Sequence, residues 1–116
     1  MQENSWKTLG SNYVYENPWC AFRVDQVELP DGSVIEYGVQ ESGGFAAVLP
    51  VTDAGRVVMV RQWRQPLGRF TLELPCGAVD EGENPQESAE RELREETGYR
   101  AEGMEALISF HTSTGR

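Results

Sequence analysis

The chain has 116 residues, with 19 acidic against 10 basic side chains and a formal net charge of −9. This length predicts one small domain, over residues 1–116, with a core of its own. The negative charge argues against nucleic-acid polymers and anionic membranes as partners, because both bind through basic faces. Two cysteines, Cys20 and Cys76, without a signal peptide or a membrane-spanning run, favour free thiols in a cytoplasmic protein.

Turn-forming residues divide much of the chain into short strands. Strands are expected over residues 20–29, 33–40, 45–51, 56–63, 70–74 and 105–110. The first two flank a Pro-Asp-Gly turn at 30–32, and the next two flank an Asp-Ala-Gly turn at 53–55. Each of these pairs therefore predicts a hairpin.

A helix is predicted from Pro85 to Thr97. Asn84 supplies the N-cap, Pro85 suits the first helical position, and Glu87 can reach back to complete a capping box. Gly98 accepts the left-handed conformation that ends helices, so the helix should stop there.

Three carboxylates share one sector of this helix. Glu92 and Glu96 lie one turn apart and Glu95 lies beside them, within about 100° of the helix circumference. Like charges at this spacing repel each other, and a hard divalent cation such as Mg²⁺ or Mn²⁺ would relieve the repulsion. The alternative interpretation is a solvated acidic face without a ligand.

The segment from Gly77 to Tyr99 resembles the Nudix box: Gly, five residues, Glu, seven residues, then Arg-Glu-Leu-Arg-Glu-Glu-Thr-Gly-Tyr. The matching positions are Gly77, Glu83, Arg91, Glu92, Leu93, Glu95, Glu96, Gly98 and Tyr99. The resemblance implies the α/β (α+β) class, as a Nudix-type α/β/α sandwich with a mixed sheet. An N-terminal β-hairpin region over 13–44 would precede a core over 45–116 that contains the box at 77–99.

The resemblance also implies roles for individual residues. The catalytic set would be Glu83, Arg91, Glu92, Glu95 and Glu96. Glu92 and Glu96, helped by Glu95 and by the backbone carbonyl of Cys76, would hold Mg²⁺ or Mn²⁺. Arg91 would orient the glutamates, while the proton from water would be accepted by Glu95 or by a downstream glutamate that relatives have and this chain lacks.

Residues 60–68, VRQWRQPLG, and 72–77, LELPCG, are similar to segments of the ADP-ribose pyrophosphatase branch of that family. The likeness implies that Arg64 contacts the substrate and that Trp19 and Tyr37 stack on adenine. It further implies a homodimer joined through residues 13–44. The arginine that the branch places a few residues after Tyr37 is absent.

The function implied is Mg²⁺-dependent hydrolysis of the pyrophosphate bond in a nucleoside diphosphate linked to another moiety, with ADP-ribose or another ADP-sugar favoured. Relatives continue for several more strands and a helix, whereas 17 residues follow Tyr99. We therefore expect a fold that is truncated at its C-terminus or completed by a partner protomer. The alternatives are a Nudix hydrolase for a different nucleotide and a weakly active or inactive nucleotide-binding or dimerisation module.

Overall fold

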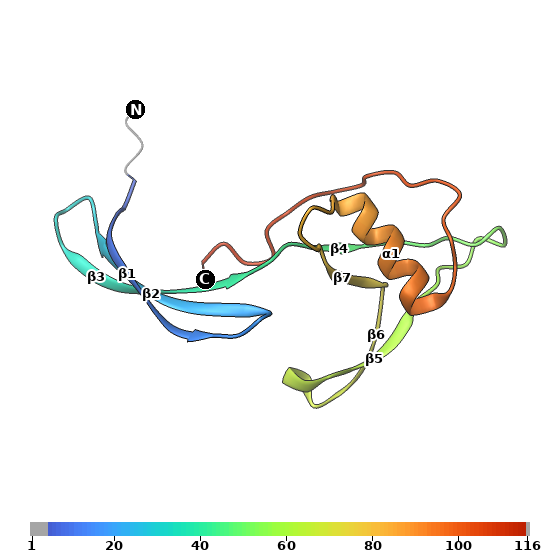
Figure 1. Cartoon of the computed structure of the whole chain (residues 1–116), viewed down its shortest axis with the longest axis horizontal. Helices are drawn as coiled ribbons and strands as arrows, with labels where there is room; N and C mark the ends of the chain where they lie inside the picture. Colours follow the sequence, from blue (N-terminus) through green and yellow to red (C-terminus); the bar gives the residue numbers. More distant parts are fainter. Residues whose placement is uncertain (1–4, 116) are drawn as a thin grey trace. The chain divides into compact units, whose positions relative to one another are not determined.

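The computed structural model describes residues 5–115 (Figure 1). Its elements in chain order are β1 (Lys7–Glu16), β2 (Cys20–Glu28), β3 (Val34–Ser42), β4 (Phe45–Ala47), β5 (Val60–Arg64), a 3₁₀ turn (Gln65–Leu67), β6 (Arg69–Glu73), β7 (Cys76–Ala78) and α1 (Pro85–Thr97). They form two compact units: β1–β3 with the end of the chain from Ser109, and residues 44–108. The described part of the chain is therefore mixed α+β, the class predicted from the sequence.

The first unit is an antiparallel sheet in the order β1-β2-β3. Cys20 pairs with Ser42 and Glu28 with Val34, so the first predicted hairpin is confirmed. Its turn closes at Gly32, whose φ of +85° is accessible to glycine without strain. Strand β1 was not predicted, because every one of its ten residues is exposed and no alternating apolar pattern marks it.

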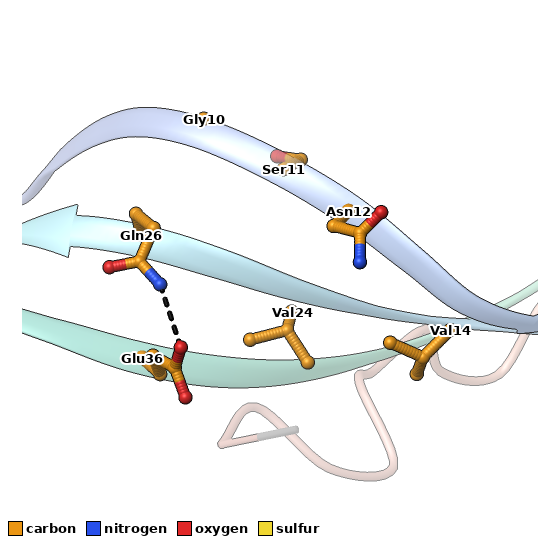
Figure 2. A pocket seen from close by; sticks show the side chains of 7 residues that line it. All are labelled: Gly10, Ser11, Asn12, Val14, Val24, Gln26 and Glu36. Atoms are coloured by element: carbon orange, nitrogen blue, oxygen red, sulfur yellow. Dashed lines mark hydrogen bonds between the residues drawn. The ribbon is translucent and has the colours of Figure 1, made fainter.

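A shallow hollow of about 440 Å³ lies on one face of this sheet (Figure 2). It is lined by Gly10, Ser11, Asn12 and Val14 of β1, Val24 and Gln26 of β2, and Glu36 of β3. Gln26 Nε2 donates to Glu36 Oε1 at 2.9 Å across the hollow's floor. None of the site residues predicted from the sequence lines this hollow, so we assign it no part in the predicted chemistry.

In the second unit, β4 pairs antiparallel with β7, placing Ala46 opposite Gly77. The predicted hairpin between residues 45–51 and 56–63 is therefore confirmed only at its tip, because β4 pairs with β7 instead. Only one isolated bridge, Val51 to Val57, and the hydrogen bonds of the turn join these segments. Pro50 interrupts the first segment, since proline has no N–H for a ladder, and Val48 N instead bonds to Pro75 O at 3.0 Å.

Strands β5 and β6 form a separate antiparallel hairpin. β5 is shorter than the strand predicted over residues 56–63. β6 matches the strand predicted over residues 70–74 to within one residue. The chain reverses through the 3₁₀ turn, which ends at Gly68 in the left-handed conformation.

The strand predicted over residues 105–110 is wrong. Within residues 5–115 these positions have no strand partner, and Leu107, Ile108 and Phe110 are 72%, 77% and 67% exposed. An apolar run becomes a strand when a sheet edge supplies its backbone hydrogen bonds, and no such edge adjoins this run in the described part of the chain.

Helix α1 has the predicted bounds, Pro85 to Thr97. Asn84 Oδ1 accepts a hydrogen bond from Glu87 N at 2.9 Å, and Glu87 Oε2 accepts one from Asn84 N at 3.0 Å. This reciprocal capping box satisfies two backbone N–H groups that a helix start otherwise leaves unpaired. Gly98 ends the helix with φ +77°.

The small core of the second unit lies where α1 packs on β4 and β7 (Figure 1). Ala46, Ala89 and Leu93 are buried there, and Ser88 is fully buried with its hydroxyl donating to Ala78 O at 3.2 Å. Around the helix, Glu92 lies between Ser88 and Ala89 and Glu96 lies beside Ala89, so this packing also fixes the direction of both carboxylates. No helix among residues 5–115 is long and apolar enough to span a bilayer.

Candidate functional site

The carboxylate of Glu92 rests directly on the backbone of Gly77. A Cβ atom at position 77 would lie 2.1 Å from Glu92 Oε1 and 2.2 Å from its Cδ, far inside van der Waals contact. Gly77 does not have a positive φ, so its backbone conformation is open to other residues. Glycine is therefore required here by the close approach of the carboxylate and not by the turn.

Arg91 is the centre of an ion-pair network on the acidic face of α1. Its Nε and Nη2 bond to Glu83 Oε2 and Oε1 at 2.8 and 3.0 Å, a bidentate pair. Its Nη1 bonds to Glu92 Oε1 at 2.8 Å and to Glu95 Oε2 at 3.2 Å. The carbonyl of Ala78 accepts from Nη2 at 3.0 Å, which ties the guanidinium to β7. Arg91 therefore fixes three of the predicted glutamates at once.

These contacts set the ionisation of Glu83. The hydrogen bonds from Arg91, supported by one from the backbone N–H of Asp80, lower the pKa of Glu83 to about 2. The same contact with Glu83 raises the pKa of Arg91. Glu83 is thus ionised at neutral pH and anchors the guanidinium of Arg91, whose orienting role stays a prediction.

Glu96 has one satisfied and one unsatisfied oxygen. Its Oε1 accepts a hydrogen bond from Gln62 Nε2 at 3.3 Å, whereas Oε2 is buried and has no partner among the described residues. A buried carboxylate oxygen without a partner is costly, and a cation or a proton would remove that cost. Residues 5–115 contain no preassembled group of three His, Cys, Asp or Glu ligands. The unpaired oxygen, one turn from Glu92, is the observation that fits a divalent cation.

Cys76 begins β7, immediately before Gly77. Burial raises the pKa of its thiol, and the nearby charge of Arg64 partly opposes that rise. The thiol is therefore neutral at physiological pH. Its free state matches the sequence-based expectation.

Arg64, the predicted substrate contact, is held at the end of β5 by Glu73. Nε and Nη2 of Arg64 bond to Glu73 Oε2 and Oε1 at 2.6 and 2.5 Å, and the Thr71 hydroxyl also donates to Glu73. These contacts lower the pKa of Glu73 to about 2, chiefly through Arg64. Glu73 and Gln62 were missed by the sequence reasoning. Side chains alternate between the two faces of a strand, and this period of two places Gln62 and Glu73 on the same face as Arg64.

Trp19 and Tyr37, the predicted adenine contacts, belong to the first unit. Trp19 lies in a turn held by Asn17 Oδ1 and is 82% exposed. Tyr37 lies on β3 opposite Asp25, and its ring packs edge-on against Trp6 at 5.7 Å between centroids. Their roles, like those of the other predicted site residues, stay predictions.

Residues 43–116 match the family model of the NUDIX domain, and residues 6–40 match the nucleoside diphosphate sugar hydrolase N-terminal domain. The chain is 41% identical over 109 residues to the methanol dehydrogenase activator of Bacillus methanolicus, across 94% of this chain and 59% of that protein. It is 39% identical over 109 residues to the ADP-ribose pyrophosphatase of Bacillus subtilis, again across 94% and 59%.

Among solved structures, the crystal structure of an ADP compounds hydrolase superposes with a TM-score of 0.75 at 23% sequence identity. The match covers 89% of this chain and 57% of that one, and it confirms the predicted fold. The chain thus spans a little over half the length of the curated relatives it matches.

Proposed function

This chain belongs to the Nudix family, and on that basis we propose that it hydrolyses the pyrophosphate bond of a nucleoside diphosphate linked to another group, with Mg²⁺ as cofactor. The observation that supports this best is the unpaired, buried Oε2 of Glu96, one helical turn from a Glu92 carboxylate seated on Gly77. Both carboxylates stand on a helix face whose direction is set by the buried Ala89 and Leu93.

The cation would be held by Glu92 and Glu96, with Glu95 and the backbone carbonyl of Cys76 as further donors. Four oxygen donors of this kind suit Mg²⁺ or Mn²⁺ and do not suit a soft metal. When bound, the cation supplies positive charge that neutralises phosphate oxygens and makes water more acidic. Mg²⁺ is the ion we propose, since it prefers carboxylates combined with substrate phosphates.

The chain's own residues have distinct tasks in this scheme. Arg91 orients Glu92 through a 2.8 Å bond and keeps Glu83 ionised as its anchor. Glu95 is 56% exposed and has one bond to Arg91, at 3.2 Å, which leaves its carboxylate open to accept a proton from the attacking water. Glu73 holds Nε and Nη2 of Arg64, so Nη1 is the group of this guanidinium that we propose to contact a phosphate of the substrate.

We propose ADP-ribose or another ADP-sugar as the substrate. The support comes from the 39% identity to a protein named ADP-ribose pyrophosphatase and from the superposition on an ADP compounds hydrolase. Trp19 and Tyr37 are the proposed contacts to adenine, since aromatic faces stack on nucleobases. The first unit, residues 13–44 in particular, is the proposed contact of a homodimer, because its sheet has long exposed edges.

The test is product analysis with ADP-ribose and Mg²⁺, comparing the parent chain with Glu96→Gln. We expect AMP and ribose 5-phosphate from the parent, and a large loss of turnover in the variant, because an amide binds a divalent cation far more weakly than a carboxylate. AMP release unaffected by Glu96→Gln would refute the role of α1. Nucleotide binding without any AMP at saturating metal would instead identify a binding module.

A further inference from the structure

The β5–β6 hairpin has a polar face, which carries Gln62 and Arg64, and a second face, on which Arg61 lies over the ring of Phe70. Pairs in register share a face, so Gln62 with Thr71 points to the same side as Arg64, while Trp63 with Phe70 points to the other. The polar side is half-buried, whereas Trp63 and Phe70 are exposed and pack edge-on at 5.4 Å. The polar side therefore faces the interior of the second unit.

On this polar side, two side chains have different partners. Arg64 is occupied within the hairpin by its bidentate bond to Glu73. Gln62, two residues earlier on the same face, reaches out of the hairpin and donates Nε2–H to Glu96 Oε1 at 3.3 Å. Among residues 5–115, this is the side-chain hydrogen bond that links the β5–β6 hairpin to α1.

The bond from Gln62 restricts the orientation of the Glu96 carboxylate. The terminal torsion of a glutamate is broad, so the plane of its carboxylate can take many orientations unless a neighbour fixes it. Gln62 occupies Oε1 and leaves Oε2 as the buried oxygen without a partner. The amide thus fixes the plane of the carboxylate and the direction in which its second oxygen points.

We infer that Gln62 is a positioning residue for metal binding, which orients Glu96 so that Oε2 is the oxygen presented to the divalent cation. This inference rests on the proposed function, since it assigns a task within the same site. The bond is long for an N–H···O contact, so we expect it to orient the carboxylate more than to stabilise the fold. Groups that hold a metal ligand from behind commonly affect metal affinity by about 10- to 100-fold.

The chain contains a matched control for this bond. On the exposed side of α1, Gln86 Nε2 donates to Glu90 Oε1, also at 3.3 Å. The two bonds have the same chemistry and length, but Glu90 has no proposed role in the site. Replacing each glutamine by methionine keeps the side-chain length and removes the donor.

The experiment titrates Mn²⁺, followed by electron paramagnetic resonance, into the parent, Gln62→Met, Gln86→Met and Glu96→Gln. We expect the Kd for Mn²⁺ to rise about 10- to 100-fold in Gln62→Met and to stay at the parent value in Gln86→Met. The metal-free melting temperatures of the two methionine variants should agree, which a purely structural role for Gln62 would not allow. Turnover in Gln62→Met should recover at high Mn²⁺.

Two outcomes distinguish a failure of the positioning role of Gln62 from a failure of the proposed metal site. If Glu96→Gln weakens Mn²⁺ binding but Gln62→Met binds like the parent, the positioning role is wrong and the proposed function stands. If Glu96→Gln itself binds Mn²⁺ like the parent, the proposed site is wrong. Should Gln62→Met not fold, Gln62→Ala replaces it in the same titration, and unchanged affinity there would equally overturn the positioning role.

Discussion

The carboxylates around α1 and the exposed Trp19 of the first unit are held in opposite ways. Around the helix, Glu83, Glu92 and Glu95 are all bonded to Arg91. In the turn between β1 and β2, Trp19 is 82% exposed and its ring has no aromatic partner among residues 5–115. The carboxylates are thus oriented by contacts within their own unit before any ligand binds, whereas Trp19 is left free to change its rotamer. Preorganisation of this kind favours binding because less entropy is lost.

The largest effect is expected from Gly77→Ala. The new Cβ would overlap the Glu92 carboxylate, which must move away because the strand backbone cannot. A displacement of about 1 Å in a reacting group can cost about 10²-fold in rate, so we expect a loss of that order in AMP formation. Gly44→Ala is the control, since a Cβ at position 44 meets no atom within 4 Å. Equal activity in the two variants would contradict the close-packed geometry of Glu92.

Arg91→Lys tests whether the planar guanidinium is needed beyond its charge. Lysine cannot make the bidentate contact with Glu83 while also bonding Glu92 and Glu95. We expect turnover to fall about 10- to 100-fold, with a rise in the Kd for Mn²⁺. Arg94→Lys on the same helix, outside this network, is the control. If the two variants behave alike, charge alone accounts for Arg91.

Trp19→Ala addresses the aromatic side of the comparison. Loss of a stacking contact of about 0.5–1.5 kcal/mol predicts a rise in KM for ADP-ribose of roughly 2- to 12-fold. The affinity for Mn²⁺ measured without nucleotide should stay unchanged, because the metal ligands proposed here lie in the other unit. A parallel loss of Mn²⁺ affinity would show that the two regions are not independent.

The smallest effect concerns the Arg64–Glu73 pair and acid stability. The pKa of Glu73 is lowered from 4.5 to about 2, so the folded state gains stability from this pair above pH 4.5. That contribution is lost as the pH falls from 4.5 toward 2. In urea unfolding at pH 5.5 and pH 3, Glu73→Gln should therefore lose less stability on acidification than the parent. Glu105→Gln, at an exposed position, should lose as much as the parent.

The predictions from sequence succeeded where the determinants are local. The bounds of α1 follow from Asn84, Pro85 and Gly98, which act on residues within one turn. The hairpin around Gly32 followed in the same way from a short turn. The helix and the hairpin both depend on residues that are close together in the chain, so the amino-acid sequence is sufficient to predict them.

The misses depend on contacts between distant residues. The partner of β4 is β7, some thirty residues along the chain, and nothing in the Phe45–Ala47 sequence distinguishes β7 from β5 as a partner. The contacts of Gln62 with Glu96 and of Glu73 with Arg64 appear only when strand register is known. Residues 105–110 have the apolar pattern of a strand, but a pattern cannot tell whether a sheet edge is present.

Helix α1 is proposed to hold a divalent cation through Glu92 and Glu96. Calorimetric titration of Mn²⁺ into the parent and into Glu92→Gln/Glu96→Gln tests it most directly. Glu90→Gln/Glu102→Gln, with the same change in charge at exposed positions, is the matched control. We predict that the control binds Mn²⁺ like the parent and that the Glu92/Glu96 variant has lost binding. Equal affinity in all three proteins would contradict the account.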